Sequence, residues 1–170
     1  MNVIVSNATP LIYLAKVGRL ELIRKLYPKV YISSEVKKEV VDIGKKLKKI
    51  DAPVIEKEIS KGWIIECKVK GSMDIPIDIE IGEKTTLILA REKSIKSVLI
   101  DDKAGRAAAK LLDLEPKGTL FILLKSLKNK EIGFNTLIKI LEGLIEKGFR
   151  LREEVYLRVI KEAREISQPD

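Results

Sequence analysis

Short apolar segments of strand length alternate with helical patterns along this chain, and this alternation limits its possible folds more than any other feature. Strand patterns cover residues 2–6, 30–32, 63–67 and 97–100. The clearest helical patterns cover residues 51–61, 80–93, 104–112, 135–146 and 152–166. Strands separated by helices pair in parallel through right-handed crossovers. The sequence therefore predicts an α/β protein, a three-layer α/β/α fold with a central parallel sheet.

No internal repeat, low-complexity segment or linker interrupts this pattern. A chain of 170 residues has the length of one domain and can bury a core. We expect residues 1–170 to form a single domain, with the C-terminal helices from about residue 133 onward packed on it.

The first helix is expected to begin with Thr9 as its N-cap and Pro10 in its first turn, since both residue types favour those positions. The helical segments within residues 10–26 carry apolar faces. Such faces suit either the core or an interface with a partner.

The composition is that of a globular protein, with 45% hydrophobic and 34% charged residues. No apolar run approaches the roughly 20 residues that span a bilayer. Neither a signal-peptide pattern nor a lipidation motif opens the chain. A cytoplasmic protein without a membrane partner is therefore expected.

The chain contains no histidine, which excludes Ser-His-Asp and Cys-His nucleophile systems and histidine-ligated zinc. The single cysteine, Cys67, has no disulfide partner and lies in an alternating apolar run, where we expect a buried strand residue. Catalysis would have to use carboxylates, lysines, hydroxyls or a hard metal ion.

The formal net charge of +8 favours a polyanionic partner such as nucleic acid. An alternative source of this charge is adaptation to heat, because Lys, Glu and Ile are abundant and Gln is almost absent, as in a thermophile. The lysine-rich run at residues 45–49 has the same two interpretations, a solvated loop or an RNA contact.

Polar residues follow two of the predicted strands at their carboxyl ends, where parallel sheets place their functional crevice. Asn7 follows the first strand, and Asp101 and Asp102 follow the most apolar one. Glu83 lies near the start of the helix at residues 80–93. Each of these residues, taken alone, could simply cap a helix or complement a helix dipole. Independent caps, however, would not be expected to lie together at one end of a parallel sheet. Because side chains alternate along a strand, only one of the two aspartates can point into the crevice, and we favour Asp102.

Several segments resemble, in the same order, those of PIN-domain proteins, and more closely those of the branch related to VapC-type toxins. They are residues 3–14, Glu39, Gly82 and Glu83 with residues 85–90, residues 99–109 and residues 118–120. Each segment alone is weakly specific, whereas their order and spacing together are more so. The resemblance covers most of the chain.

The resemblance implies a metal-dependent endoribonuclease of the toxin–antitoxin type. The candidate catalytic residues are Asn7, Glu39, Glu83, Asp101 and Asp102, with Thr9 and Arg106 as supporting residues. Converging carboxylates repel one another unless a cation neutralises them, and Mg²⁺ or Mn²⁺ is the hard ion that suits oxygen ligands. Asn7, Glu83 and Asp102 would hold it. Arg106 would pair with Asp102 or contact a phosphate.

One departure concerns Asn7, because many PIN domains carry Asp at this position. An amide oxygen can bind a hard cation but contributes no charge, so weaker metal binding is expected. The alternative function is therefore a weak or inactive PIN-fold module that binds nucleic acid or a protein. For the toxin type, RNA, a small antitoxin and a second copy of the chain are the expected partners. Paired aspartates also occur in phosphoryl-transfer receivers and phosphatases, but the accompanying Thr/Ser and Lys pattern is missing.

Overall fold

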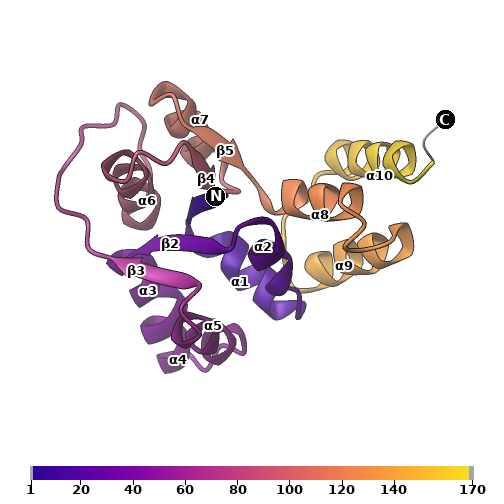
Figure 1. Ribbon diagram of the computed structural model, residues 1–170, viewed down its shortest axis with the longest axis horizontal. Coiled ribbons are helices and arrows are strands. Elements are labelled where there is room, and N and C mark those ends of the chain that lie inside the picture. The colour runs from indigo at the N-terminus through magenta and orange to yellow at the C-terminus, as the bar shows by residue number, and fades with distance from the viewer. Residues whose placement is uncertain (1, 169–170) are drawn as a thin grey trace.

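A computed structural model describes residues 2–168 and is built around a five-stranded sheet in the order β3-β2-β1-β4-β5 (Figure 1). The strands are β1 (Val3–Ser6), β2 (Lys29–Ser33), β3 (Ile64–Cys67), β4 (Ser97–Leu99) and β5 (Glu115–Lys117). All four strand pairs are parallel. The predicted central parallel sheet is therefore confirmed.

Helices connect the strands and follow the last one. They are α1 (Ala8–Lys16), α2 (Glu21–Leu26), α3 (Ser34–Lys37), the π-helical turn η1 (Lys38–Ile43), α4 (Gly44–Lys46), α5 (Asp51–Ser60), α6 (Ile81–Glu92), α7 (Lys103–Leu111), α8 (Thr119–Lys128), α9 (Phe134–Glu146) and α10 (Glu153–Ser167). The sequence did not indicate the π-helical turn, which continues α3 and carries Glu39.

The two faces of the sheet bury separate groups of side chains. Ile4 and Leu99 belong to a core that includes residues of α1, α2 and α8 to α10. Val5, Val98 and Ile100 belong to a second core with residues of α6 and α7. Because neighbouring residues of a strand point to opposite faces, this division shows helices on both sides of the sheet. The three-layer α/β/α prediction is confirmed.

The chain reverses the direction in which it builds the sheet at β1. It first adds β2 and β3 on one side of β1, then crosses to add β4 and β5 on the other. The N–H of Asn7 donates to the carbonyl oxygen of Leu99 at 3.0 Å, so the polar residues that follow β1 and β4 lie side by side. Such a switch point is where open parallel sheets bind their ligands.

The sequence analysis missed β5, which lies at the edge of the sheet and contains Pro116. Proline cannot donate a ladder hydrogen bond and is tolerated mainly on edge strands. The strand is held by its flanks, because the N–H of Glu115 donates to Lys96 and the N–H of Ile100 donates to Lys117. Its three residues, Glu115–Lys117, contain no apolar run that would indicate a strand.

The predicted cap of the first helix is wrong. The helix begins at Ala8, with Asn7 at the N-cap position, and Thr9 lies inside its first turn. The side chain of Asn7 makes no cap hydrogen bond. Its amide is therefore not used by the helix.

The apolar faces of the helices within residues 10–26 belong to the core, since Leu11, Leu14, Leu22 and Ile23 are buried. They are not available as an interface. At the C-terminal end, α10 contacts α8 and α9, and α9 also contacts α1 (Figure 1). Within residues 2–168, no helix combines the length and apolar character needed to cross a membrane.

Leu99 links β4 to the larger core and is fully buried, whereas Leu111 at the end of α7 is 61% exposed. We expect Leu99→Ala to lower the free energy of unfolding by about 2–5 kcal/mol, because it removes buried methyl groups and leaves a cavity. Leu111→Ala, the matched control, should change it by less than about 0.5 kcal/mol. Urea unfolding followed by circular dichroism measures both, and similar losses would contradict the assigned core.

Candidate functional site

Asn7 and Glu39 meet over the first turn of α6. A Cβ atom placed on Gly82 would lie 3.4 Å from Oδ1 of Asn7 and 3.2 Å from Oε2 of Glu39. Asn7 comes from the end of β1 and is buried, and Glu39 comes from η1. Glycine at position 82 lets these two oxygen atoms approach the backbone of α6 closely.

Glu83, the next residue of α6, is buried with 7% of its surface exposed. Its Oε2 accepts a hydrogen bond from the N–H of Glu80 at 3.1 Å, which fixes the start of the helix. On its other side, a Cβ atom placed on Gly105 would lie 3.5 Å from Oε1 of Glu83. The carboxylate is therefore held between the first turns of α6 and α7.

Asp102 is the N-cap of α7, and its Oδ2 accepts from the N–H of Gly105 at 3.0 Å. It lines an open pocket of about 450 Å³ together with Glu80 and Glu83, and the remaining lining comes from Asp78, Ile79 and Ala104. The structure thus brings Asp102 and Glu83 to the same pocket.

This cluster is electrostatically unbalanced. Burial raises the pKa of Glu83, the hydrogen bond from Glu80 opposes that rise, and the charges of Asp102, Glu80 and Glu39 add to it. Desolvation of its carboxylate, followed by the charge of Glu80, raises the pKa of Glu39. Among residues 2–168, no ion pair includes Glu39, Glu80, Glu83 or Asp102. In the described part of the chain, their negative charge is therefore not neutralised by a paired Lys or Arg.

The available donors are hard oxygen atoms. In the part of the chain that the structure describes, no three His, Cys, Asp or Glu side chains are grouped to ligate one ion. Mg²⁺ keeps several waters and is commonly held by one or two carboxylates. Glu83 and Asp102 each use one oxygen in a helix-start hydrogen bond. The remaining oxygens, with the amide oxygen of Asn7, suit a largely hydrated divalent ion.

Asp101 points away from this pocket. Its Oδ1 accepts from the N–H of Thr119 at 2.7 Å, and its Oδ2 accepts from the Thr119 hydroxyl at 2.6 Å. Burial raises the pKa of Asp101, while the two bonds from Thr119 and the charge of Arg106 oppose that rise. Both oxygens are engaged in joining β4 to the start of α8. Of the two neighbouring aspartates, Asp102 is the one that shares a pocket with Glu83.

Arg106 forms no ion pair with Asp102 within residues 2–168, so the first of its two expected roles is not seen, while contact with a phosphate stays a prediction. Its Nη1 donates to the carbonyl oxygen of Ile100 at 3.1 Å, on the side of Asp101 and Gly118. Thr9 is partly exposed in the first turn of α1, and no hydrogen bond of its hydroxyl occurs within residues 2–168. Neither supporting residue contacts the acidic pocket.

Sequence reasoning missed Glu80 and Thr119. Glu80 stands three residues before Glu83, a spacing typical of reciprocal helix capping, which is a local signal for it. Thr119 has no such local signal, because its bonds to Asp101 join segments 18 residues apart. A third missed contact joins the Ser33 hydroxyl to that of Thr85 at 2.8 Å and fixes α6 against the end of β2.

The parallel sheet, its helices on both faces and the acidic pocket beside its switch point define a three-layer α/β protein with an acidic site at the carboxyl ends of its strands. A family model described as a PIN domain matches residues 3–165. The chain therefore belongs to the PIN-domain family. No curated protein shows significant similarity to it. PIN domains have a nuclease-type fold and generally depend on a divalent metal ion.

The Asp101–Thr119 contact supports a prediction about stability. Asp101→Ala should lower the free energy of unfolding by about 2–4 kcal/mol, because it leaves the buried N–H of Thr119 without an acceptor. Asp101→Asn keeps one acceptor for this N–H and offers an N–H to the Thr119 hydroxyl. It should therefore lose much less, as measured by urea unfolding at pH 7.

The same pair of variants tests the pKa of Asp101. The raised pKa means that the folded protein holds this proton more tightly than the unfolded chain, where the pKa is about 3.9. Its contribution to stability is full below that value and is lost as the pH rises through the folded pKa. The free energy of unfolding of the wild type, relative to Asp101→Asn, should fall as the pH rises above about 4. Parallel pH profiles would contradict the raised pKa.

Proposed function

We propose that this PIN domain is a metal-dependent endoribonuclease of the toxin–antitoxin type, active in the cytoplasm, which hydrolyses RNA phosphodiesters with an activated water. One observation carries the proposal. The buried Glu83 shares a pocket with Asp102 beside Asn7 and Glu39, and none of these carboxylates forms an ion pair within residues 2–168. A divalent ion would relieve this repulsion.

Asn7, Glu83 and Asp102 are the residues that would hold Mg²⁺ or Mn²⁺. When bound, such an ion lowers the pKa of a water and stabilises negative charge on phosphate oxygens. Glu39 reaches the same place from η1, and its solvent-exposed carboxylate next to Asn7 is placed to accept a proton. We assign it the proton of the attacking water.

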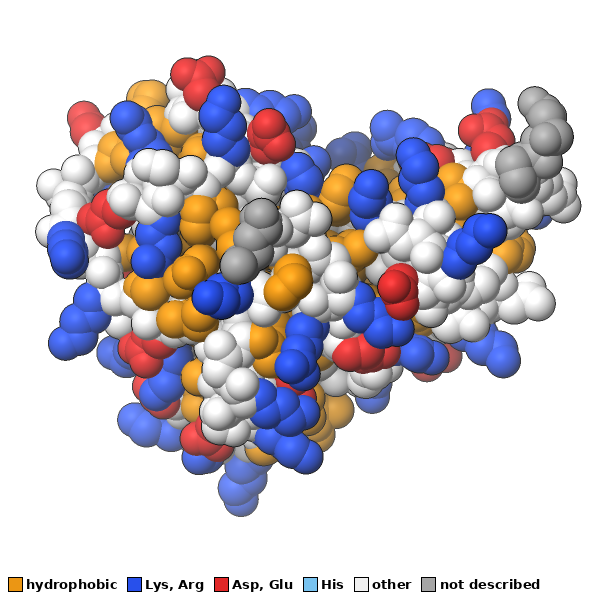
Figure 2. Space-filling model, in the orientation of Figure 1, with side chains coloured by type: hydrophobic (Ala, Val, Ile, Leu, Met, Phe, Trp, Pro, Cys, Tyr) orange, Lys and Arg blue, Asp and Glu red, His pale blue; other side chains and the backbone are white. Residues whose placement is uncertain are grey.

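The charge of the molecule supports an anionic substrate. The chain carries 33 Lys and Arg residues against 25 Asp and Glu residues. Figure 2 shows these basic side chains spread over the visible face rather than gathered in one patch. A distributed positive surface attracts a polyanion over a long range without specifying its sequence.

A second candidate function rests on Asn7. Its amide replaces a charged ligand, so the site holds less negative charge for a metal ion. A non-catalytic module that binds nucleic acid or a protein partner would keep the fold without needing tight metal binding.

The toxin type also implies protein partners, and we propose a small antitoxin and a second copy of the chain. The exposed apolar side chains that lie close in sequence, and are available for such contacts, are Ile43, Leu47, Ile50 and Val54. Size-exclusion chromatography with light scattering tests the second copy directly.

Cleavage of a structured RNA in Mn²⁺ or Mg²⁺ tests the leading proposal. Asp102→Asn and Glu83→Gln should each slow cleavage by about 100-fold or more, because each removes one of the few charged ligands. Both changes keep the hydrogen bonds that start the helices. Asn caps a helix as well as Asp does, and Gln can replace Glu at the third helical position. Asp113→Asn, at an exposed position after α7, is the matched control and should retain full activity.

Cleavage that survives both substitutions would contradict the proposed site. Retained RNA binding without any cleavage by the wild type would favour the non-catalytic module.

Metal binding can be measured apart from activity by calorimetry with Mn²⁺. Asn7→Asp should tighten binding by about tenfold, or about 1.4 kcal/mol, because it adds a charge next to Glu39. Without metal the same variant should unfold more easily than the wild type, since the added carboxylate is buried among like charges. Asn135→Asp, exposed in the first turn of α9, should leave the Mn²⁺ affinity unchanged and should not destabilise the protein, since a carboxylate there complements the helix dipole. Unchanged Mn²⁺ affinity in Asn7→Asp would remove Asn7 from the ligand set.

A further inference from the structure

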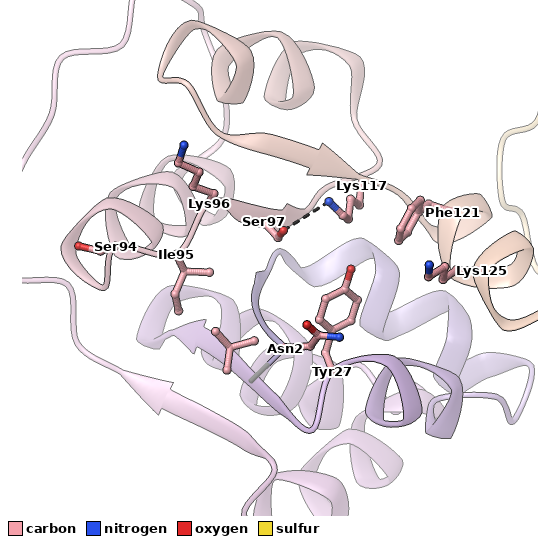
Figure 3. Close-up of a pocket in the computed structure, with 10 residues that line it drawn as sticks. Asn2, Tyr27, Ser94, Ile95, Lys96, Ser97, Lys117, Phe121 and Lys125 are labelled. Atoms are coloured by element: carbon pink, nitrogen blue, oxygen red, sulfur yellow. Dashed lines mark hydrogen bonds between the residues drawn. The ribbon is translucent and has the colours of Figure 1, made fainter. Parts of the chain in front are cut away.

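A second pocket lies at the amino ends of the strands, opposite to the acidic site at their carboxyl ends. Its volume is about 430 Å³, and its lining includes Asn2 before β1, Lys96 and Ser97 at the start of β4, and Lys125 of α8. Figure 3 shows these residues around an open space between the start of β1, the start of β4 and α8. Because the strands are parallel, the amino ends of the strands, where this pocket lies, are separated from the acidic pocket by the length of a strand.

The charge of this pocket is opposite to that of the acidic site. Lys96, Lys117 and Lys125 line it, and no acidic residue does so among those that the structure describes. Lys117 Nζ lies 3.3 Å from both Ser97 Oγ and Glu115 Oε2. The contact with Glu115 is an ion pair, and Glu115 itself is exposed outside the lining. Lys96 and Lys125 form no ion pair within residues 2–168, so their charges are available to a ligand. Three lysines around one space favour an anionic group such as a phosphate.

Two aromatic rings lie beside the lysines. Phe121 is partly buried in the wall of the pocket, with Lys117 Nζ 5.3 Å from its ring centroid. Tyr27 is buried, and its hydroxyl group points into the space in Figure 3. Aromatic side chains next to cations are the combination with which proteins bind single-stranded nucleic acid, since bases stack on the rings and phosphates contact the cations.

We propose that this pocket binds one nucleotide, with its phosphate on Lys117 and Lys125 and its base against Phe121. The pocket volume lies at the lower end of the range for small-ligand sites, which suits a single nucleotide unit. The ligand is either a nucleotide within a single-stranded RNA or a free nucleoside monophosphate. This inference goes beyond the proposed nuclease activity, because binding here needs no metal ion.

Binding of a fluorescein-labelled octauridylate, measured by anisotropy in EDTA, tests the site, with unlabelled UMP as competitor. We expect Lys117→Gln and Lys125→Gln each to weaken binding by about three- to tenfold and to reduce the slope of log K against log salt by about 0.7. Phe121→Leu should weaken binding by about fivefold or more through lost stacking. Competition by UMP at submillimolar concentration assigns the site to free nucleotides, and binding of the octamer alone assigns it to a strand.

Lys128→Gln is the matched control, because it removes the same charge from the same helix outside the pocket. It should leave the affinity within twofold of the wild type. Equal losses in Lys125→Gln and Lys128→Gln, an unchanged affinity in Phe121→Leu, or no binding of either probe would each overturn the proposal. EDTA prevents metal-dependent cleavage, so the binding measurement does not depend on nuclease activity. A lack of binding here would likewise not contradict the proposed activity of the acidic site.

Discussion

The parallel pairing of β1 with β4 is the constraint on which the rest of the structure depends. It aligns Ser6 with Leu99 and joins the N–H of Asn7 to the same residue. Two segments far apart in the chain thereby end at one point, and the helices that follow them start there. Without this pairing, Asn7 and Asp102 would be isolated helix-start residues. With it, Asn7 lies against Gly82 and Asp102 shares a pocket with Glu83, both in the first turn of α6.

This arrangement disfavours the charged form of the Glu83 carboxylate. A buried carboxylate normally acquires a basic partner, because burial without one disfavours the charged form. Glu83 instead has other carboxylates around it, and its compensation is limited to one backbone N–H. Asp101, one residue from Asp102, shows the opposite solution, with two bonds from Thr119 and an arginine nearby. The two neighbouring aspartates thus have different roles. Asp101 joins β4 to the start of α8, and Asp102 faces the pocket.

The sequence was sufficient for the sheet because apolar runs and helical periodicity are local signals. It also indicated that the polar residues after β1 and β4, Asn7 and Asp102, would lie at the same end of the sheet, because neighbouring strands are parallel. It failed where the outcome depends on distant contacts. Neither the bonds from Thr119 to Asp101 nor the turn of Arg106 toward the Ile100 carbonyl has a local signature. The edge strand that contains Pro116 was missed for a related reason. Its pairing with β4, rather than its own composition, makes it a strand.

The two pockets at opposite ends of the strands are lined by side chains of opposite charge. At the carboxyl edge, strands lead into helix starts, where acidic side chains such as Glu83 and Asp102 cap the N–H groups and favour the helix dipole. At the amino edge, the turn before β4 supplies Lys96, and α8 supplies Lys125. A polyanion is attracted to the second edge without assistance, whereas it can approach the first only when a cation offsets the carboxylates. If both proposals hold, the two ends of the strands separate a metal-independent place for holding a nucleic acid from a metal-dependent place for reacting with it.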